Sequence, residues 1–306
     1  MKPAIFVCGK QSVEKTSLIR TVINTLPSSP LYNTSGNELF ETPVVDFVEA
    51  NSSDTDKIPV PDEAQAVWFC IDGGSSMLSQ EEADSIKSLD ERALVVVTKS
   101  ESLNENQIKS LMDFLLGFVS RDQIVLVSED KKSGLPCLVN RTKKIIENTL
   151  NNLSSSSVPP CFDREWDSFF SRRLQLWSQK NEEEANSYIT WAAGRAAAIA
   201  IVPLPLADVA PLVANEIYMI YRLAGVYGIA NDQSLISMII GCTGGSLVGK
   251  LGSSFLPFLK IPIAAAVTYG VGKAAKAFFE SGMELNGDTL LEIFEKAKEE
   301  ASNLFW

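Results

Sequence analysis

Residues 9–16 read GKQSVEKT, and this stretch lies between the apolar run Ala4–Cys8 and a segment with helical periodicity. A strand, a turn that contains glycine and a helix start form the setting of a phosphate-binding loop, because backbone N–H groups at a helix N-terminus bind anions. In such a loop we expect Gly9 to permit the turn, Lys15 to reach the β- and γ-phosphates and Thr16 to hold Mg²⁺. The stretch therefore predicts a nucleotide site.

One position departs from the phosphate-loop pattern GxxxxGK[ST], because Glu14 stands where the second glycine is expected. Its carboxylate brings a negative charge close to the phosphates, and two like charges ~5 Å apart repel by roughly 1 kcal/mol in water. Its side chain also obstructs the close approach of the backbone to the phosphates. We expect Glu14 to weaken nucleotide binding.

The rest of residues 1–150 alternates short apolar runs with helical patterns. Buried strands that alternate with helices predict an α/β domain with a mainly parallel sheet. The expected strands are residues 4–8, 44–48, 66–71, 93–97 and 124–127, and the expected helices are residues 15–25, 79–89, 104–118 and 138–150.

A break in composition divides the chain. Residues 151–160 read NNLSSSSVPP, which is typical of a linker. Residues 161–306 show helical patterns without comparable strands, and they predict an all-α domain. The expected helices are residues 162–179, 185–202, 210–227, 233–256 and 261–280, with a last helix that begins at Thr289.

Composition excludes several classes of protein. The chain has 306 residues and a net charge of −11, which argues against a nucleic-acid binder. It contains no histidine, so Ser-His-Asp and Cys-His catalysis are excluded. Its five cysteines show no CxxC pair. We expect no signal peptide in residues 1–30, because the apolar run Ala4–Cys8 is only five residues long. We expect reduced thiols in a cytoplasmic protein.

Three segments in order resemble the motifs of Era-like GTPases. GKQSVEKTS is similar to their phosphate loop, VVVTKSE at residues 95–101 to their guanine-reading TKxD motif, and residues 125–135 to their VSAKxxxGL segment. The resemblance implies a Ras-like P-loop NTPase fold that binds GTP or GDP with Mg²⁺. It places Thr98, Lys99, Glu101 and Ser128 at the base, with Glu101 in place of aspartate.

The switch motifs of such GTPases are poorly matched. Asp46 is the best candidate for the DxxG aspartate and for a metal ligand beside Thr16, yet no glycine follows three residues later. Residues 41–43 are an alternative, and Thr34 is the nearest candidate for the switch threonine. No catalytic residue can be named, so we expect hydrolysis to be impaired or absent. The alternative is retained activity with unusual residues.

The second half resembles a bacterial helical domain of unknown function that often follows Era-like GTPase domains. The resemblance covers about residues 185–282 and rests on Pro203, Pro205, Asp208 and the segments 219–222 and 268–270. It implies no activity for particular residues. Asp208 has two interpretations, a functional carboxylate or a helix N-cap, and the Pro-Leu-Pro break before it favours the cap.

The apolar character of this half raises the question of a membrane. The longest charge-free run, residues 233–249, has 17 residues, and a span needs about 20. We expect a compact bundle rather than a membrane span.

These observations favour a guanine-nucleotide-binding or pseudo-GTPase regulator that acts through its helical domain on a protein or a membrane surface. One alternative is a non-enzymatic interaction module that binds no nucleotide. Another is a membrane-associated component.

Overall fold

A computed structural model describes most of the chain as two compact units. The first comprises Met1–Lys180 with Gly228–Ala230, and the second comprises Asn181–Tyr227 with Asn231–Trp306. The described residues are 2–24, 31–32, 37–50, 64–74, 84, 91–130, 132–153, 160–201, 209–230, 233–252 and 257–304.

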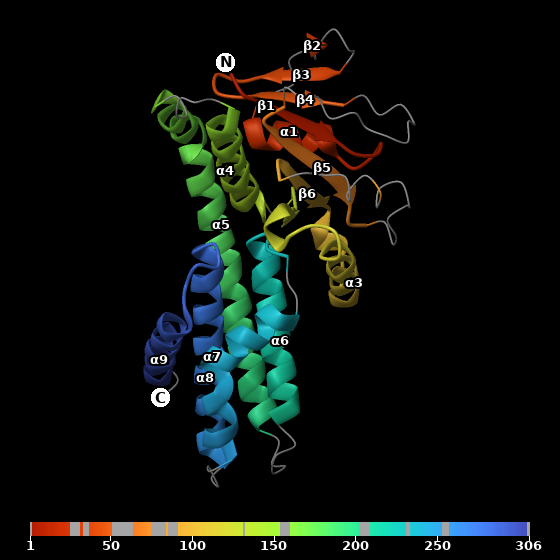
Figure 1. The fold of residues 1–306 in the computed structure, drawn as a ribbon. Helices are drawn as coiled ribbons and strands as arrows, with labels where there is room; N and C mark the ends of the chain where they lie inside the picture. The colour runs from red at the N-terminus through yellow and green to blue at the C-terminus, as the bar shows by residue number, and fades with distance from the viewer. Residues whose placement is uncertain are drawn as a thin grey trace. The chain divides into compact units, whose positions relative to one another are not determined.

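The first unit is built on a seven-stranded sheet in the order β2-β3-β4-β1-β5-β6-β7 (Figure 1). Strands β4, β1, β5, β6 and β7 are parallel, whereas β3 runs antiparallel to β4 and β2 antiparallel to β3. The carboxyl ends of the central strands therefore meet at one edge. The strands are β1 Ala4–Cys8, β2 Leu31–Tyr32, β3 Glu38–Glu41, β4 Asp46–Glu49, β5 Ala66–Asp72, β6 Ala93–Thr98 and β7 Ile124–Leu126.

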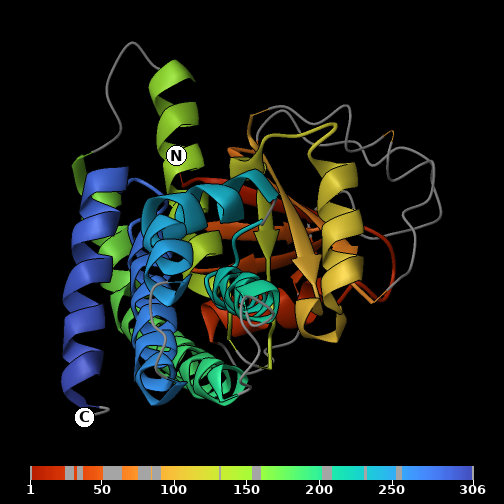
Figure 2. The ribbon, with the colours of Figure 1, turned by 90° about the horizontal axis from the view of Figure 1, so that it is seen from below.

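Helices cover both faces of this sheet. On one face α1 (Lys15–Ile23) and α4 (Leu135–Leu153) bury a core that includes Trp68, whose indole N–H donates to Thr142 at 2.9 Å. On the other face α3 (Glu105–Leu115) packs against a second core. Figure 2 shows α3 and α4 on opposite sides of the strands. Two short 3₁₀ helices, η1 Ser100–Ser102 and η2 Arg121–Gln123, complete the unit in its described part.

Helix α5 (Pro160–Ala200) joins two expected helices into one of 41 residues. Its aromatic face, with Phe162, Trp166 and Phe170, is buried in the α1–α4 core. This burial assigns residues 160–180 to the first unit, so the division by contacts falls after Lys180 and not at the expected linker. Residues 228–230 also belong to the first unit, where the amide of Leu126 donates to the carbonyl of Gly228 at 3.0 Å.

The second unit is helical throughout its described residues. It contains the end of α5 with α6 Val209–Val226, α7 Gln233–Gly252, α8 Pro257–Glu280 and α9 Gly287–Leu304. Helix α8 packs against α6, α7 and α9. Gly270 of α8 allows the close approach of α9, since a Cβ on Gly270 would lie 2.8 Å from the Phe294 ring. None of the described helices has the length and apolar character that crossing a bilayer would require.

The expected fold class, an α/β P-loop domain of the Ras-like type followed by an all-α region, is confirmed. Strands β2 and β3 were not predicted, because they are only two and four residues long and too short to show a strand pattern. Helix α9 begins at Gly287 and not at Thr289, since the side chain of Asn286 accepts from the Thr289 amide at 2.9 Å and caps the helix. Thr34, Asp208 and nearly all of the helix expected at residues 79–89 lie outside the described residues.

Candidate functional site

The loop between β1 and α1 adopts backbone angles that favour glycine. Gly9 has φ 139°, Ser12 has φ 72° and Glu14 has φ 60°. A Cβ on Gly9 would lie 2.2 Å from the Cys70 carbonyl oxygen, so only glycine fits there. Glu14 is the N-cap of α1 and holds a left-handed conformation without the freedom that glycine has. The loop thus keeps a conformation suited to glycine at a position where the sequence has glutamate.

Lys15 is buried inside this loop. Its ammonium donates to the carbonyl oxygens of Gly9 at 3.1 Å and Lys10 at 2.9 Å. Those two bonds hold the positive charge at the concave side of the loop, where backbone N–H groups also gather. An incoming phosphate would exchange these carbonyl contacts for a charge-assisted bond, which is stronger.

Thr16 pairs with a carboxylate at the end of β4. Its hydroxyl donates to both carboxylate oxygens of Glu49, at 2.9 and 2.7 Å. Burial raises the pKa of Glu49, and the bond from Thr16 works in the opposite direction. A hydroxyl and one carboxylate are a donor set that Mg²⁺ accepts when substrate phosphates and waters supply the remaining ligands. The described residues hold no cluster of three or more Cys, Asp or Glu fit for a metal ion.

Asp46, the carboxylate expected beside Thr16, lies at the opposite end of the same strand. It pairs with Ala4 at the start of β1, and its carboxylate forms an ion pair with Lys2 at 2.6 Å. Parallel pairing of β4 with β1 brings the last residue of each strand to the loop and leaves the first residue far from it. The structure therefore places Glu49, and not Asp46, beside Thr16.

The TKSE segment that follows β6 is tied to the phosphate loop. The buried Thr98 hydroxyl donates to the carbonyl oxygens of Val13 and Ile71, both at 3.1 Å. The Lys99 ammonium donates to the Ser12 carbonyl oxygen at 3.1 Å. Two of the expected base-site residues are thus brought to the loop.

Two carboxylates surround the same lysine. The Lys99 ammonium lies 3.1 Å from Asp72 and 3.6 Å from Glu14. The hydrogen bond from Lys99 to Asp72 is the main cause that raises the pKa of Lys99. Glu14 therefore forms an ion pair with Lys99. Glu14 stands at the position where the phosphate-loop pattern has glycine, which has no side chain.

The remaining base-site candidates are placed differently. Glu101 is exposed on η1, while Ser128 is buried and its amide donates to the Ser133 carbonyl at 3.1 Å. The next residue, Glu129, accepts a short hydrogen bond from the Ser17 hydroxyl on α1. Its other oxygen is buried and makes no hydrogen bond within the described residues, and burial raises the pKa of Glu129. The Glu129 carboxylate thus links the loop after β7 to α1.

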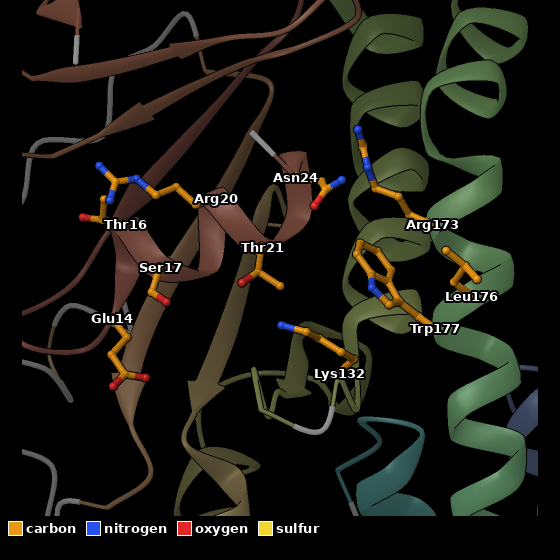
Figure 3. Close-up of a pocket in the computed structure, with 10 residues that line it drawn as sticks. All are labelled: Glu14, Thr16, Ser17, Arg20, Thr21, Asn24, Lys132, Arg173, Leu176 and Trp177. Carbon is orange, nitrogen blue, oxygen red and sulfur yellow. The ribbon is translucent and has the colours of Figure 1, made fainter. Parts of the chain in front are cut away.

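A cavity of about 640 Å³ extends along α1 from the phosphate loop (Figure 3). Figure 3 shows Thr21 and Asn24 of α1 facing Arg173 and Trp177 of α5, with Lys132 pointing into the space between them. Three cations and one acid line the cavity, so it favours an anionic ligand in a chain that is acidic overall. Its lining residues are Glu14, Thr16, Ser17, Arg20, Thr21, Asn24, Lys132, Arg173, Leu176 and Trp177.

Sequence reasoning missed Glu49, Asp72 and Glu129 as members of this site. Glu49 and Asp72 are the last residues of β4 and β5. Because acidic residues at the carboxyl ends of parallel strands meet at one sheet edge, their positions were a usable signal. The contact of Glu129 with α1 depends on the path of the loop after β7, which no pattern in the sequence marks.

Parts of the chain are similar to known proteins. Residues 171–302 match the family described as "Domain of unknown function (DUF697)". Over 130 residues the chain is 32% identical to "Magnetosome membrane protein 22" of Magnetospirillum gryphiswaldense, a match of 34% of this chain and 65% of that relative. The match thus leaves about a third of that relative's length uncovered.

Among solved structures, the chain is similar to the G domain of the T. maritima FeoB iron transporter, with a TM-score of 0.34 and 13% identity over 47% of this chain and 99% of the other. It is also similar to a variant of SsGBP, with a TM-score of 0.34 and 12% identity over 50% of this chain and 57% of the other.

Proposed function

We propose that this chain is a GTPase-like regulator that binds guanine nucleotide weakly, through Mg²⁺ and the phosphates, and acts through its helical region on a partner. One observation carries the proposal. The phosphate end of the site has a glycine-like loop, a buried Lys15 and a Thr16 hydroxyl paired with the Glu49 carboxylate. Mg²⁺ bound there would neutralise part of the phosphate charge, and the Thr16–Glu49 pair would hold it.

Weak binding follows from the acids around the loop. A nucleotide triphosphate would face Glu14 at the loop and Glu129 beside α1, and each adds a repulsion of about 1 kcal/mol or more in a partly buried site. We expect dissociation constants in the micromolar range or weaker, which corresponds to a binding free energy of about −8 kcal/mol or less favourable.

Hydrolysis is expected to be very slow or absent. With Glu49 as the acid at the end of β4, the residue three positions later is Ser52, and no glycine stands there to contact the γ-phosphate. The chain has no histidine, and no Gln lies near Glu49 in the sequence to orient the attacking water. A turnover of about 1–10 per second in the absence of a partner would contradict this proposal.

Titration of the full chain with fluorescent GTP, GDP and ATP, each with and without Mg²⁺, tests nucleotide binding. We expect saturable binding that Mg²⁺ tightens and that Lys15→Ala reduces at least tenfold. Lys10→Ala is the matched control, because Lys10 is exposed in the same loop. Absence of binding at millimolar nucleotide would favour the second candidate, a non-enzymatic interaction module that uses the first unit as a scaffold.

The partner is proposed from the helical region. The relative that matches part of this chain is called a magnetosome membrane protein, and this name favours a membrane surface as the partner, or a protein located there. We propose a cytoplasmic chain that associates peripherally with a membrane.

A further inference from the structure

Two helices of the second unit share an exposed face that combines aromatic rings with guanidinium groups. Trp191 on α5 is 51% exposed, and the Arg195 guanidinium lies 4.5 Å from the centre of its indole ring. Tyr218 on α6 joins them, with its ring 6.0 Å from Trp191 and 5.7 Å from the Arg195 guanidinium. Figure 1 shows α5 and α6 side by side in the second unit, and a hydrogen bond of 2.9 Å from the Asn215 side chain to the Ala192 carbonyl holds the two helices together.

The same arrangement repeats one turn away. The Arg222 guanidinium lies 4.9 Å from the Tyr188 ring and donates to its hydroxyl at 2.5 Å. Spacings of three and four residues on α5, and of four on α6, put both clusters on one side of the helix pair. Alternating rings and guanidinium groups therefore form a stripe, which we call the Trp191 stripe and which comprises Tyr188, Trp191, Arg195, Tyr218 and Arg222.

The surface beside the stripe is uncharged. On α5, Gly194, Ala198 and Ile201 are exposed, and Ile201 is 61% exposed at the end of the helix. On α6 the exposed side chains include Ala210, Pro211 and Ala214. The described face thus offers small and apolar side chains in a chain whose composition is acidic.

One acidic side chain touches the stripe, at its Tyr188 end: Glu184 accepts a hydrogen bond from the Tyr188 hydroxyl at 3.2 Å. Residues 185–207 contain no Asp or Glu. The one acid of α6, Glu216, is buried, and burial raises the pKa of its carboxyl to about 8. Among the described residues, the Trp191–Arg195 end of the face therefore has a guanidinium charge without a neighbouring acid, and the half-buried Glu184 lies only at the Tyr188–Arg222 end.

We propose that the Trp191 stripe docks on the surface of an anionic lipid bilayer, with Trp191 and Ile201 at the level of the headgroups and Arg195 and Arg222 on lipid phosphates. The proposal rests on the membrane partner of the proposed function and names its contact surface. Trp and Tyr favour the membrane–water interface because each has an apolar ring and a polar group. An anionic lipid surface attracts juxtaposed cationic side chains such as these guanidinium groups.

Co-sedimentation of the full chain with vesicles tests the proposal, without nucleotide, so that its outcome is independent of the nucleotide titration. The probes are vesicles of phosphatidylcholine alone and vesicles of phosphatidylcholine with 30% phosphatidylglycerol. We expect binding to the anionic vesicles only, weakened at least fivefold by Trp191→Ala and by Arg195→Glu. Leu291→Ala is the control, because Leu291 is 45% exposed on α9 and lies outside the stripe; it should bind as the original chain does.

Several results would overturn the proposal. Equal binding to both kinds of vesicle, no binding to either, or unchanged binding by both stripe variants would each exclude a lipid-docking stripe. Light scattering on the same samples covers a further occupant, a second copy of the chain. If the chain is a dimer that Trp191→Ala converts to a monomer, the stripe is a protein interface instead. Circular dichroism of Trp191→Ala and of Arg195→Glu, each with the spectrum of the original chain, shows that loss of binding does not arise from unfolding.

Discussion

The phosphate end and the base end of the proposed nucleotide site differ in how well their residues are placed to bind a nucleotide. At the phosphate end, Lys15 and Thr16 lie where a phosphate and Mg²⁺ would need them, and Glu49 supplies a carboxylate. At the base end, Thr98 and Lys99 are tied to the loop, but Glu129 occupies the space beside α1 and Glu101 is exposed on η1. From this difference we infer that phosphate binding and base recognition are separable in this fold.

The largest predicted effect is on the pH dependence of stability, and it arises in the second unit, apart from the nucleotide site. Glu216 is buried on α6, it accepts a hydrogen bond from the Thr268 hydroxyl at 3.4 Å, and burial raises its pKa to about 8. Between about pH 4.5 and pH 8 Glu216 therefore keeps its proton in the folded state and loses it in the unfolded state. The free energy of unfolding falls as pH rises through this range and then levels off. The fall is on the order of 4 kcal/mol.

Urea unfolding at pH 5, 7 and 9 measures that fall, and Glu216→Gln should remove most of it. The raised pKa values of Glu49 and Glu129 give a change of the same sign, which the Gln variant leaves in place. A variant with the pH profile of the original chain would show that Glu216 is not the source.

The second prediction concerns the phosphate end and Mg²⁺. We expect Mg²⁺ to tighten nucleotide binding by the original chain at least tenfold and by Glu49→Gln less than twofold, because the amide oxygen is a weaker ligand for a hard cation. Asp46→Asn is the control, since Asp46 lies at the other end of β4. Loss of the Mg²⁺ effect in the Asp46 variant, with the Glu49 variant unaffected, would reverse the assignment.

The third prediction concerns the base end. Glu129→Ala removes a half-buried charge near the loop and releases the Ser17 hydroxyl. Repulsion of about 1 kcal/mol is relieved, so nucleotide affinity should rise roughly fivefold. Asp130→Ala removes a charge of the same sign from the neighbouring residue, and should change affinity less. Titration with GTP measures both, and an unchanged affinity in the Glu129 variant would show that this acid does not oppose binding.

The smallest predicted effect is on stability at the loop itself. Glu14 holds a left-handed conformation that costs about 1–2 kcal/mol for a residue with a Cβ. Glycine removes that cost but adds freedom to the unfolded chain, so Glu14→Gly should stabilise the protein by about 0.5–1 kcal/mol. Ser17→Gly on the same helix should instead destabilise it by about 0.5 kcal/mol or more. Thermal unfolding compares the two variants. Destabilisation by Glu14→Gly would show that the backbone of Glu14 is not strained in the folded protein.

Sequence reasoning predicted the parallel strands of the sheet and the loop because the residues of each are contiguous. The apolar run Ala4–Cys8 with GKQSVEKT identified β1, the turn and α1, and TKSE identified the end of β6. The acids of the site were harder to predict. Glu49 reaches Thr16 through the register of β4 on β1, and a shift of the expected strand start by two residues was enough to favour Asp46.

The same limit applies to the long helix α5. Its aromatic half and its small-residue half have different periodicities of burial, so they predict two helices. The polar segment between them, which includes residues 181–184, forms uninterrupted helix, because charged residues such as Glu and Lys are good helix formers.

The relative affinity for GTP and ATP shows whether the phosphate end binds nucleotide while the base end does not discriminate between guanine and adenine. The original chain is titrated with both nucleotides in the presence of Mg²⁺, with Lys15→Ala as the control for phosphate binding. We predict micromolar binding of both, a preference for GTP of less than about tenfold, which is about 1.4 kcal/mol, and loss of both in the Lys15 variant. A preference for GTP of a hundredfold or more, or binding that Lys15→Ala leaves intact, would contradict the account.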